Sequence, residues 1–211
     1  MECRYLRFPP RSPPPTVATM NTDHLELLIS DEWREKLLEV ILPHALNGIR
    51  LGDDVLEIGP GPGMTTDLLR ADIVGLTAVE LDAGLASDLA KRLADTNVTV
   101  RHADAAALPF DDHRFTAVVS FTMLHHVPTA PLQDRVFAEV GRVLRPGGLF
   151  VATDSLASED LAALHVGDIY NPAEPNGLTD RLAAAGFEDI RVQSYVDHWM
   201  IHARKTAAAV N

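Results

Sequence analysis

Residues 55–66 read VLEIGPGPGMTT, an apolar stretch that runs directly into a glycine-rich turn and then into a helix start. This order of strand, turn and helix brings backbone N–H groups close to a ligand, so it predicts a site for a nucleotide-like molecule. Met64 stands where a dinucleotide-binding turn has its third small residue. Pro60 and Pro62 remove two N–H donors that a pyrophosphate would use. The segment therefore disfavours a nicotinamide cofactor. The alternative to a ligand site is that these glycines only form a tight turn between strand and helix.

Strands and helices alternate from Asp53 onward, which is typical of a parallel sheet covered on both faces. We expect two helices before this region, starting near Leu25. Beyond residue 154 the alternation gives way to a loop-rich stretch and then to two strands so close together that they must form a hairpin. The expected strands are 55–58, 76–80, 98–102, 115–121, 149–153, 189–196 and 199–205, and the expected later helices are 64–71, 83–94, 131–144 and 178–185.

The chain divides into a proline-rich tail, residues 1–19, and one domain, residues 20–211. The tail has no helical or strand period, so we expect it to be disordered, with Met20 as an alternative start. Within the domain we expect N-terminal helices at 20–50, a ligand-binding core at 53–153, a lid on the substrate side at 154–178, and a C-terminal helix and hairpin at 179–211.

Composition limits the partners of this domain. Lys and Arg number 18 against 30 Asp and Glu, and the net charge of −12 disfavours nucleic acid and anionic membranes. No apolar run reaches the roughly 18 residues of a membrane span. Cys3 is the only cysteine, so no intramolecular disulfide can form, and we expect a reducing, cytoplasmic location. The sequence does not indicate an oligomeric state.

Two acidic residues follow the next two strands. Glu80 closes the second strand, where a carboxylate can accept hydrogen bonds from both hydroxyls of a ribose. Asp82 fits better as the cap of the following helix. After the third strand, Asp104 can accept a hydrogen bond from an exocyclic amine and the Ala105 N–H can meet a ring nitrogen. The alternative for Asp104 is a turn-forming residue.

Five motifs now stand in order over roughly residues 50–153: VLEIGPGPG, AVELD, HADAAALPFDDHRFTAVVS, FTMLHHV and EVGRVLRPGG. Together they resemble the class I S-adenosylmethionine-dependent methyltransferases of the small-molecule, ubiquinone-biosynthesis-like type. The resemblance implies an α/β fold, a Rossmann-like three-layer sandwich whose seven-stranded, mostly parallel sheet ends in an antiparallel hairpin. It also implies S-adenosyl-L-methionine as cofactor and a small-molecule methyl acceptor.

The resemblance further implies a role for each residue of the predicted cofactor site. Gly59, Pro60, Gly61 and Gly63 would wrap the methionine moiety, Glu57 would orient the turn from behind, Glu80 would hold the ribose, Leu81 would pack on the adenine, Asp104 and Ala105 would face its edge, and Ser120 would lie beside the sulfonium.

His125 and His126 follow the fourth strand and are candidates for a general base. Methyl transfer mainly needs alignment, but a base helps when the acceptor is a hydroxyl. Adjacent side chains are expected to point apart, so we expect only His125 to reach the acceptor, which slightly favours O-methylation over C- or N-methylation. The alternative is that both histidines form a polar lip.

Other residues give weaker indications. His165, Asp168 and Tyr170 could line the acceptor pocket or be solvated. His24 could close the cleft from the other side, whereas Trp33 fits the core.

We expect no metal. His198 and His202 have an i, i+4 spacing, but that spacing does not converge on a hairpin. Two alternative functions remain: a non-catalytic protein that binds S-adenosylmethionine or S-adenosylhomocysteine, and a nicotinamide-linked oxidoreductase, which the glycine spacing disfavours.

Overall fold

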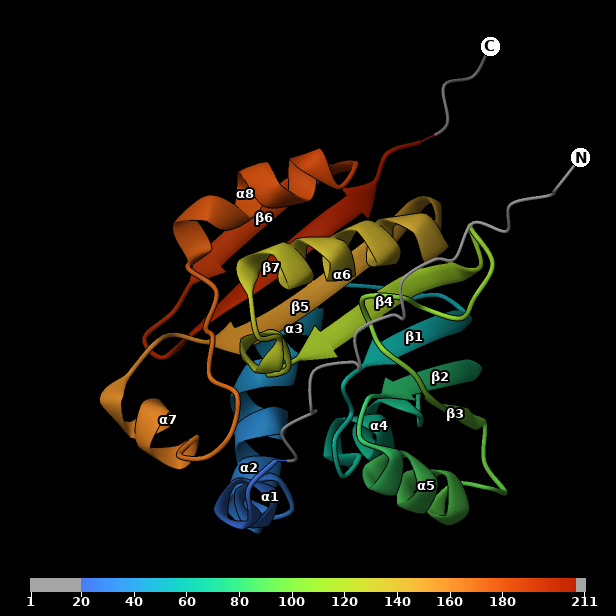
Figure 1. Ribbon diagram of the computed structural model, residues 1–211. Helices are drawn as coiled ribbons and strands as arrows, with labels where there is room; N and C mark the ends of the chain where they lie inside the picture. Colours follow the sequence, from blue (N-terminus) through green and yellow to red (C-terminus); the bar gives the residue numbers. More distant parts are fainter. Residues whose placement is uncertain (1–19, 208–211) are drawn as a thin grey trace, which may run out of the picture.

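A computed structural model describes residues 20–207, which form one sheet with helices on both faces (Figure 1). The expectations for the tail at 1–19 and for Cys3 lie outside the described residues. The sheet has seven strands in the order β3-β2-β1-β4-β5-β7-β6. The expected α/β sandwich with a terminal hairpin is therefore confirmed.

Five strands of the sheet are parallel and form its ligand-binding part. The order reverses between β1 and β4, where an open α/β sheet binds its ligands beyond the carboxyl ends of the strands. β7 pairs antiparallel with β5 and with β6, as the predicted hairpin requires. The strands are β1 (Asp54–Ile58), β2 (Gly75–Glu80), β3 (Val98–His102), β4 (Phe115–Phe121), β5 (Leu144–Ser155), β6 (Phe187–Ser194) and β7 (His198–Lys205).

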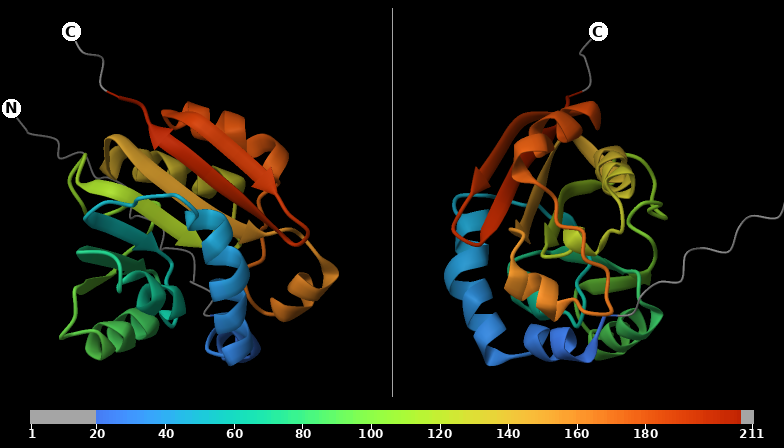
Figure 2. Two further views of the ribbon diagram at one scale, coloured as in Figure 1. Left: turned by 180° about the vertical axis from the view of Figure 1, so that it is seen from behind. Right: turned by 60° about the vertical axis from the view of Figure 1, so that its left-hand side comes forward.

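The helices bury one apolar cluster on each face of the sheet. One face is covered by α6 (Ala130–Val143) and α8 (Pro175–Ala184). The other face is covered by α4 (Met64–Leu69), α5 (Ala83–Arg92), the π-helical turn η1 (Leu37–Ile41) and α3 (Leu42–Leu46). Figure 2 shows the chain of N-terminal helices running across this second face. No helix among residues 20–207 is both long and apolar enough to cross a membrane.

The N-terminal helices are α1 (Thr22–Leu28) and α2 (Asp31–Lys36). Ser30 caps α2 as its sequence position suggests, because its hydroxyl accepts the N–H of Trp33 at 3.1 Å. The Asn21 side chain caps α1 by accepting the His24 N–H at 2.9 Å. α2 continues through η1 into α3, and Trp33 packs against the core as expected.

Two elements differ most from the prediction. A short helix, α7 (Glu159–Leu164), lies in the stretch predicted as loop. Its six residues are too few to show a helical period, although Ser158 caps it by accepting the Leu161 N–H at 3.1 Å. β5 begins at Leu144 rather than 149, because the residues around Gly147, whose φ is +75°, form an irregularity in its pairing with β4 rather than a separate turn.

Candidate active site

The glycine-rich turn joins β1 to α4 at the reversal point of the sheet. Gly59, Gly61 and Gly63 have φ values of +68°, +55° and +93°, which favour glycine. The Gly59 N–H donates to the Val79 carbonyl at 2.9 Å. A Cβ placed on Gly61 would meet only Leu28 Cδ1, at 3.8 Å, so the backbone there is open to a ligand. The turn thus fits a ligand that approaches the main chain closely.

Glu57 holds this turn from behind. Its carboxylate accepts hydrogen bonds from the hydroxyls of Thr65 and Thr66, the latter at 2.6 Å. Burial raises the pKa of Glu57 to about 7, although the two hydroxyls act to lower it. These bonds join the end of β1 to the start of α4, and the role of Glu57 in orienting the turn stays a prediction.

Glu80 lies at the carboxyl end of β2 and touches the turn. Its Oε2 accepts the Gly61 N–H at 3.0 Å, and its Oε1 accepts the Asp82 N–H at 2.9 Å. Burial raises the pKa of Glu80 above its usual range, and these N–H donors oppose that shift. Each oxygen keeps a second lone pair that can accept a hydroxyl. Asp82 caps α5 by accepting the Leu85 N–H at 2.9 Å, as its position suggested.

Asp104, Ala105 and Leu81 follow β3 and β2 at the same end of the sheet. The exposed Asp104 carboxylate accepts the Ala106 N–H at 2.8 Å, so it forms a local turn. Ala105 is half-buried, whereas Leu81 is 45% exposed. By the predicted roles, the exposed Leu81 side chain would contact an adenine ring and the neighbouring Glu80 carboxylate its ribose.

Ser120 and Met123 connect the turn to the next part of the site. Ser120 is buried and pairs in register with Ile58 across β4 and β1. A Cβ on Gly59 would collide with the Met123 side chain. The end of β4 therefore packs directly against the glycine turn, and the residues that follow it lie beside the predicted cofactor site.

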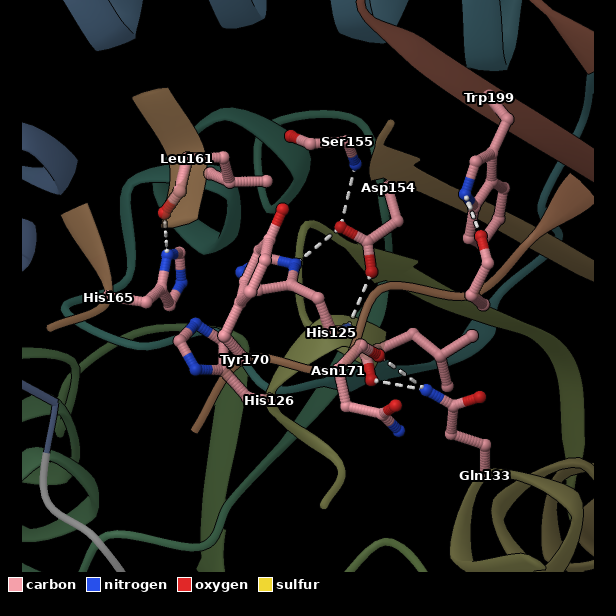
Figure 3. Close-up of polar contacts among 12 residues, drawn as sticks. His125, His126, Gln133, Asp154, Ser155, Leu161, His165, Tyr170, Asn171 and Trp199 are labelled. Atoms are coloured by element: carbon pink, nitrogen blue, oxygen red, sulfur yellow. Dashed lines mark hydrogen bonds and ion pairs between the residues drawn. The ribbon is translucent and has the colours of Figure 1, made fainter. Parts of the chain in front are cut away.

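His125 lies on the 3-10 turn η2 (Leu124–His126) after β4, and Asp154 lies near the end of β5. Both side chains are buried, and the His125 Nδ1 is 2.5 Å from Asp154 Oδ1 (Figure 3). Asp154 Oδ2 also accepts the backbone N–H of His125 at 2.8 Å. Because the carboxylate accepts the Nδ1–H, the Nε2 keeps its lone pair. That atom has no hydrogen-bond partner among residues 20–207.

The expectation that His125 and His126 point apart is wrong. Their ring centroids are 4.2 Å apart, because the tight turn after Thr122, whose φ is +50°, lets both rings lean into one space beneath α1. The polar-lip alternative also fails for His125, which is 2% exposed. Figure 3 shows Asp154 on one side of His125, with His126 and His165 on the other.

His24 of α1 and His165 after α7 complete a group of four imidazoles. The His24 ring is 5.0 Å from His126 and 4.5 Å from His165, centroid to centroid. Burial lowers the pKa of His24 to about 4 and that of His126 to about 2, and the neighbouring histidines add to both shifts. Burial also lowers the pKa of His165, so a solvated His165 is excluded. Burial therefore favours the neutral form of these three imidazoles.

Asp168 and Tyr170 lie beside this group. The Asp168 side chain is 3% exposed, and its Oδ2 lies 3.8 Å from His24 Nδ1 and 3.9 Å from His126 Nδ1. The Tyr170 ring is 5.1 Å from His165. The loop after α7 therefore places both side chains beside the four imidazoles, and their role in lining an acceptor pocket stays a prediction.

Asp154 is the functional candidate that sequence reasoning missed. The sequence pattern that could have indicated Asp154 is its place at the end of the apolar stretch LFVATD, because Glu80 has the same position at the end of β2. His198 and His202 do not converge, in agreement with the expectation for the hairpin. His198 Nδ1 is 2.8 Å from Asp197, and the His202 Nε2 donates to the Ala45 carbonyl at 2.6 Å.

Comparisons with known proteins agree with this geometry. Residues 56–152 match the family model described as a methyltransferase domain. A protein of Mycolicibacterium smegmatis named as a probable S-adenosylmethionine-dependent methyltransferase is 36% identical over 144 residues, 65% of this chain and 52% of its own length. The 27-O-demethylrifamycin SV methyltransferase of Amycolatopsis mediterranei is 36% identical over 123 residues, 55% of this chain and 43% of its own length.

The fold is similar to that of phosphoethanolamine N-methyltransferase 2 from Haemonchus contortus, solved in complex with S-adenosyl-L-methionine. The TM-score is 0.69 at 18% identity, with 90% of this chain and 58% of that chain covered. The chain spans about half the length of the curated relatives it matches. Names of further relatives include a sterol C-methyltransferase and a ribosomal RNA methyltransferase, so the comparisons leave the acceptor undefined.

Proposed function

Because residues 56–152 match a methyltransferase-domain family model, we propose that the chain is a class I S-adenosylmethionine-dependent methyltransferase that transfers a methyl group to the oxygen of a small, apolar acceptor. The observation that carries the choice of oxygen is the buried pair of His125 and Asp154 beside the glycine turn. A C- or N-methyltransferase needs no such pair if its acceptor atom already holds a free electron pair.

The cofactor would lie across the carboxyl ends of β1, β2 and β4. The open backbone at Gly61 would take its amino-acid part, and the buried Glu80 carboxylate its ribose hydroxyls. Leu81 offers an exposed apolar surface for the adenine ring, and Asp104, two residues after His102, which pairs with Glu80 across β3 and β2, would take its amine. When bound, S-adenosylmethionine supplies an electrophilic methyl group on its sulfonium.

His125 would accept the proton of the acceptor hydroxyl on its Nε2. Asp154 fixes the tautomer that leaves this lone pair free, and its negative charge stabilises the imidazolium that forms. The surrounding burial excludes water, which would otherwise compete for the site. The proton therefore moves from the acceptor to Nε2 while Nδ1–H stays on Asp154.

Charge supports a small acceptor rather than a nucleic acid. A net charge of −12 repels a phosphate backbone, and His125 and His165 are each less than 5% exposed. The buried imidazole rings offer flat, weakly polar surfaces. A reducing, cytoplasmic location remains part of this proposal.

The test incubates the full chain with a methyl-labelled S-adenosylmethionine, a fractionated metabolite extract and, separately, ribosomal RNA. We expect label in a small molecule whose new methyl group is cleaved as an ether or ester. Label only in RNA, or only on carbon or nitrogen, would contradict the proposal.

A second candidate is a non-catalytic cofactor-binding protein, favoured by the near-complete burial of His125 beneath α1 and the loop after α7. Calorimetry that shows S-adenosylhomocysteine binding, together with no labelled product from any fraction, would support this candidate.

A further inference from the structure

Four histidines from three separate segments meet on the acceptor side of the site. His24 comes from α1, His125 and His126 from η2, and His165 from the end of α7. We name these four residues the histidine cluster. One nitrogen from each lies within 4.8 Å of the others. We propose that the histidine cluster binds a divalent transition-metal ion.

The distances are close to those of a metal site. Zn²⁺ binds imidazole nitrogen at about 2.0–2.1 Å, which places the nitrogens of a tetrahedral site roughly 3.3 Å apart. The nitrogens lie within 4.8 Å of one another, so binding an ion would have to draw the most distant of them about 1.5 Å closer together.

The nitrogens that face one another lack partners. The Nδ1 of His24 and the Nε2 of His125, His126 and His165 are buried and make no hydrogen bond within residues 20–207. Buried polar atoms are rarely left unpaired, because each has given up its bonds to water. Neutral imidazoles can all direct lone pairs at one point only if a cation occupies it, so the cluster has the donor set of a metal site.

Two of the four rings are already held in the tautomer that a metal needs. His125 donates Nδ1–H to Asp154, and His165 donates Nδ1–H to the Leu161 carbonyl at 2.6 Å. In both rings the free lone pair is therefore on Nε2, the atom that faces the cluster. A carboxylate or carbonyl behind the imidazole is the usual second partner of a metal-binding histidine.

Asp168 adds a carboxylate to this arrangement. Its Oδ2 is buried without a hydrogen-bond partner in the described part of the chain, and it lies 3.8 Å from His24 Nδ1. With Asp154, it supplies two negative charges around a space that would hold a doubly charged ion. Imidazole donors favour Zn²⁺, Fe²⁺, Co²⁺, Ni²⁺ or Cu²⁺ over Mg²⁺ and Ca²⁺, which prefer oxygen.

This inference departs from the sequence expectation of no metal, and it changes the role of one residue in the proposed function. The Nε2 of His125 cannot bind an ion and accept a proton at the same time. With the ion bound, His125 would act as a metal ligand, and the ion would polarise the oxygen of an acceptor that joins it. The metal site itself stands whether or not the acceptor is a hydroxyl.

The test uses full-length protein without a polyhistidine tag, freed of metal by a chelator. Zn²⁺ is titrated against a chromophoric chelator at pH 7.5, and Co²⁺ is added separately for its visible spectrum. We expect one Zn²⁺ per chain, and a Co²⁺ spectrum of four-coordinate nitrogen ligation. His24→Ala and His165→Ala should each weaken Zn²⁺ binding more than about 100-fold, and Asp154→Asn about 10–100-fold.

The exposed His44, which belongs to a different histidine pair, provides the matched control. His44→Ala should leave the Zn²⁺ affinity unchanged, and S-adenosylhomocysteine binding verifies that each variant is folded. If a buried variant does not fold, the metal site is tested instead with the half-buried His126→Gln and with the Co²⁺ spectrum of the native chain. Unchanged Zn²⁺ affinity in the folded cluster variants, or a Co²⁺ spectrum of six-coordinate aqua type, would overturn the metal site without affecting methyl transfer.

Discussion

The two sides of the candidate site are built in opposite ways. On the cofactor side, the carboxylates of Glu57, Glu80 and Asp104 all accept hydrogen bonds from groups within about 20 residues of themselves. On the acceptor side, the histidine cluster joins segments more than 100 residues apart and leaves its central nitrogens unpaired.

This contrast shows which side is complete without a ligand. Satisfied polar groups stabilise their own conformation, so the cofactor side is preorganised. The acceptor side carries a cost for each unpaired atom, of about 1–3 kcal/mol, which only a ligand, ion or proton can remove. Changes on the cofactor side should therefore alter affinity or stability, and changes on the acceptor side should alter turnover.

The largest effect is expected for His125→Gln. Loss of the Nε2 lone pair, which the proposed function uses as a base and the proposed metal site as a ligand, should lower kcat about 10²–10⁴-fold, while the affinity for S-adenosylhomocysteine stays the same. The measurement is steady-state kinetics on the acceptor found by mass scan, with calorimetry for affinity. A full rate in the variant would mean that alignment alone drives the reaction. A loss of S-adenosylhomocysteine affinity would contradict the separation of the cofactor side from the acceptor side.

The next effect concerns Glu57 and the pH dependence of stability. The unfolded side chain ionises near pH 4.5, but the buried one keeps its proton until about pH 7. Between these values the folded state binds more protons, so the free energy of unfolding should fall as pH rises, by up to about 3 kcal/mol. Urea unfolding at several pH values should show a flatter dependence in Glu57→Gln. Exposed Glu188→Gln is the control, and identical slopes in all three proteins would contradict the prediction.

Glu80→Ala should weaken S-adenosylhomocysteine binding by about 1–3 kcal/mol, because the ribose loses its acceptor. Asp82→Ala is the matched comparison on the same turn. It removes the cap of α5 and should cost about 1 kcal/mol of stability with no change in affinity. Calorimetry and urea unfolding on both variants separate the two roles, and equal affinities would remove Glu80 from the ribose site.

The smallest effect is expected for Leu81→Ala. The side chain is 45% exposed, so its loss should change stability by less than about 0.5 kcal/mol, yet cofactor binding should weaken by about 1 kcal/mol. Val196→Ala, at a side chain that is 99% exposed in the hairpin turn, should change neither quantity. If Leu81→Ala leaves cofactor affinity unchanged, as Val196→Ala should, then Leu81 does not contact the adenine.

The same contrast explains what could be predicted from the sequence. The glycine turn, Glu80 and Asp82 act on neighbours along the chain, so spacing alone indicated where they lie. The convergence of His24 with His165 depends on how α1 and α7 dock, and no local pattern encodes that. His126 was misjudged because backbone direction alone does not determine where two adjacent rings end in a tight turn.

The bounds of the helices and strands were likewise predicted well only where a local sequence pattern marks them. Strands with long apolar runs, such as 115–121, were predicted at their observed limits. The six-residue α7 was missed because one and a half turns show no periodicity, and the early start of β5 was missed because proline and glycine at 146–148 usually signal a turn.

The seven-residue helix α1 has a consequence for the timing of ligand exchange. Leu28 lies over the open backbone at Gly61, and His24 enters the histidine cluster four residues earlier. The Asn21 amide that caps this helix also donates to the Leu164 carbonyl of α7 at 2.6 Å. α1 therefore lies over both the glycine turn and the histidine cluster, and the Asn21 hydrogen bond joins it to α7. For the proposed methyl transfer, we expect release of the spent cofactor and release of the product both to depend on how often this one helix opens.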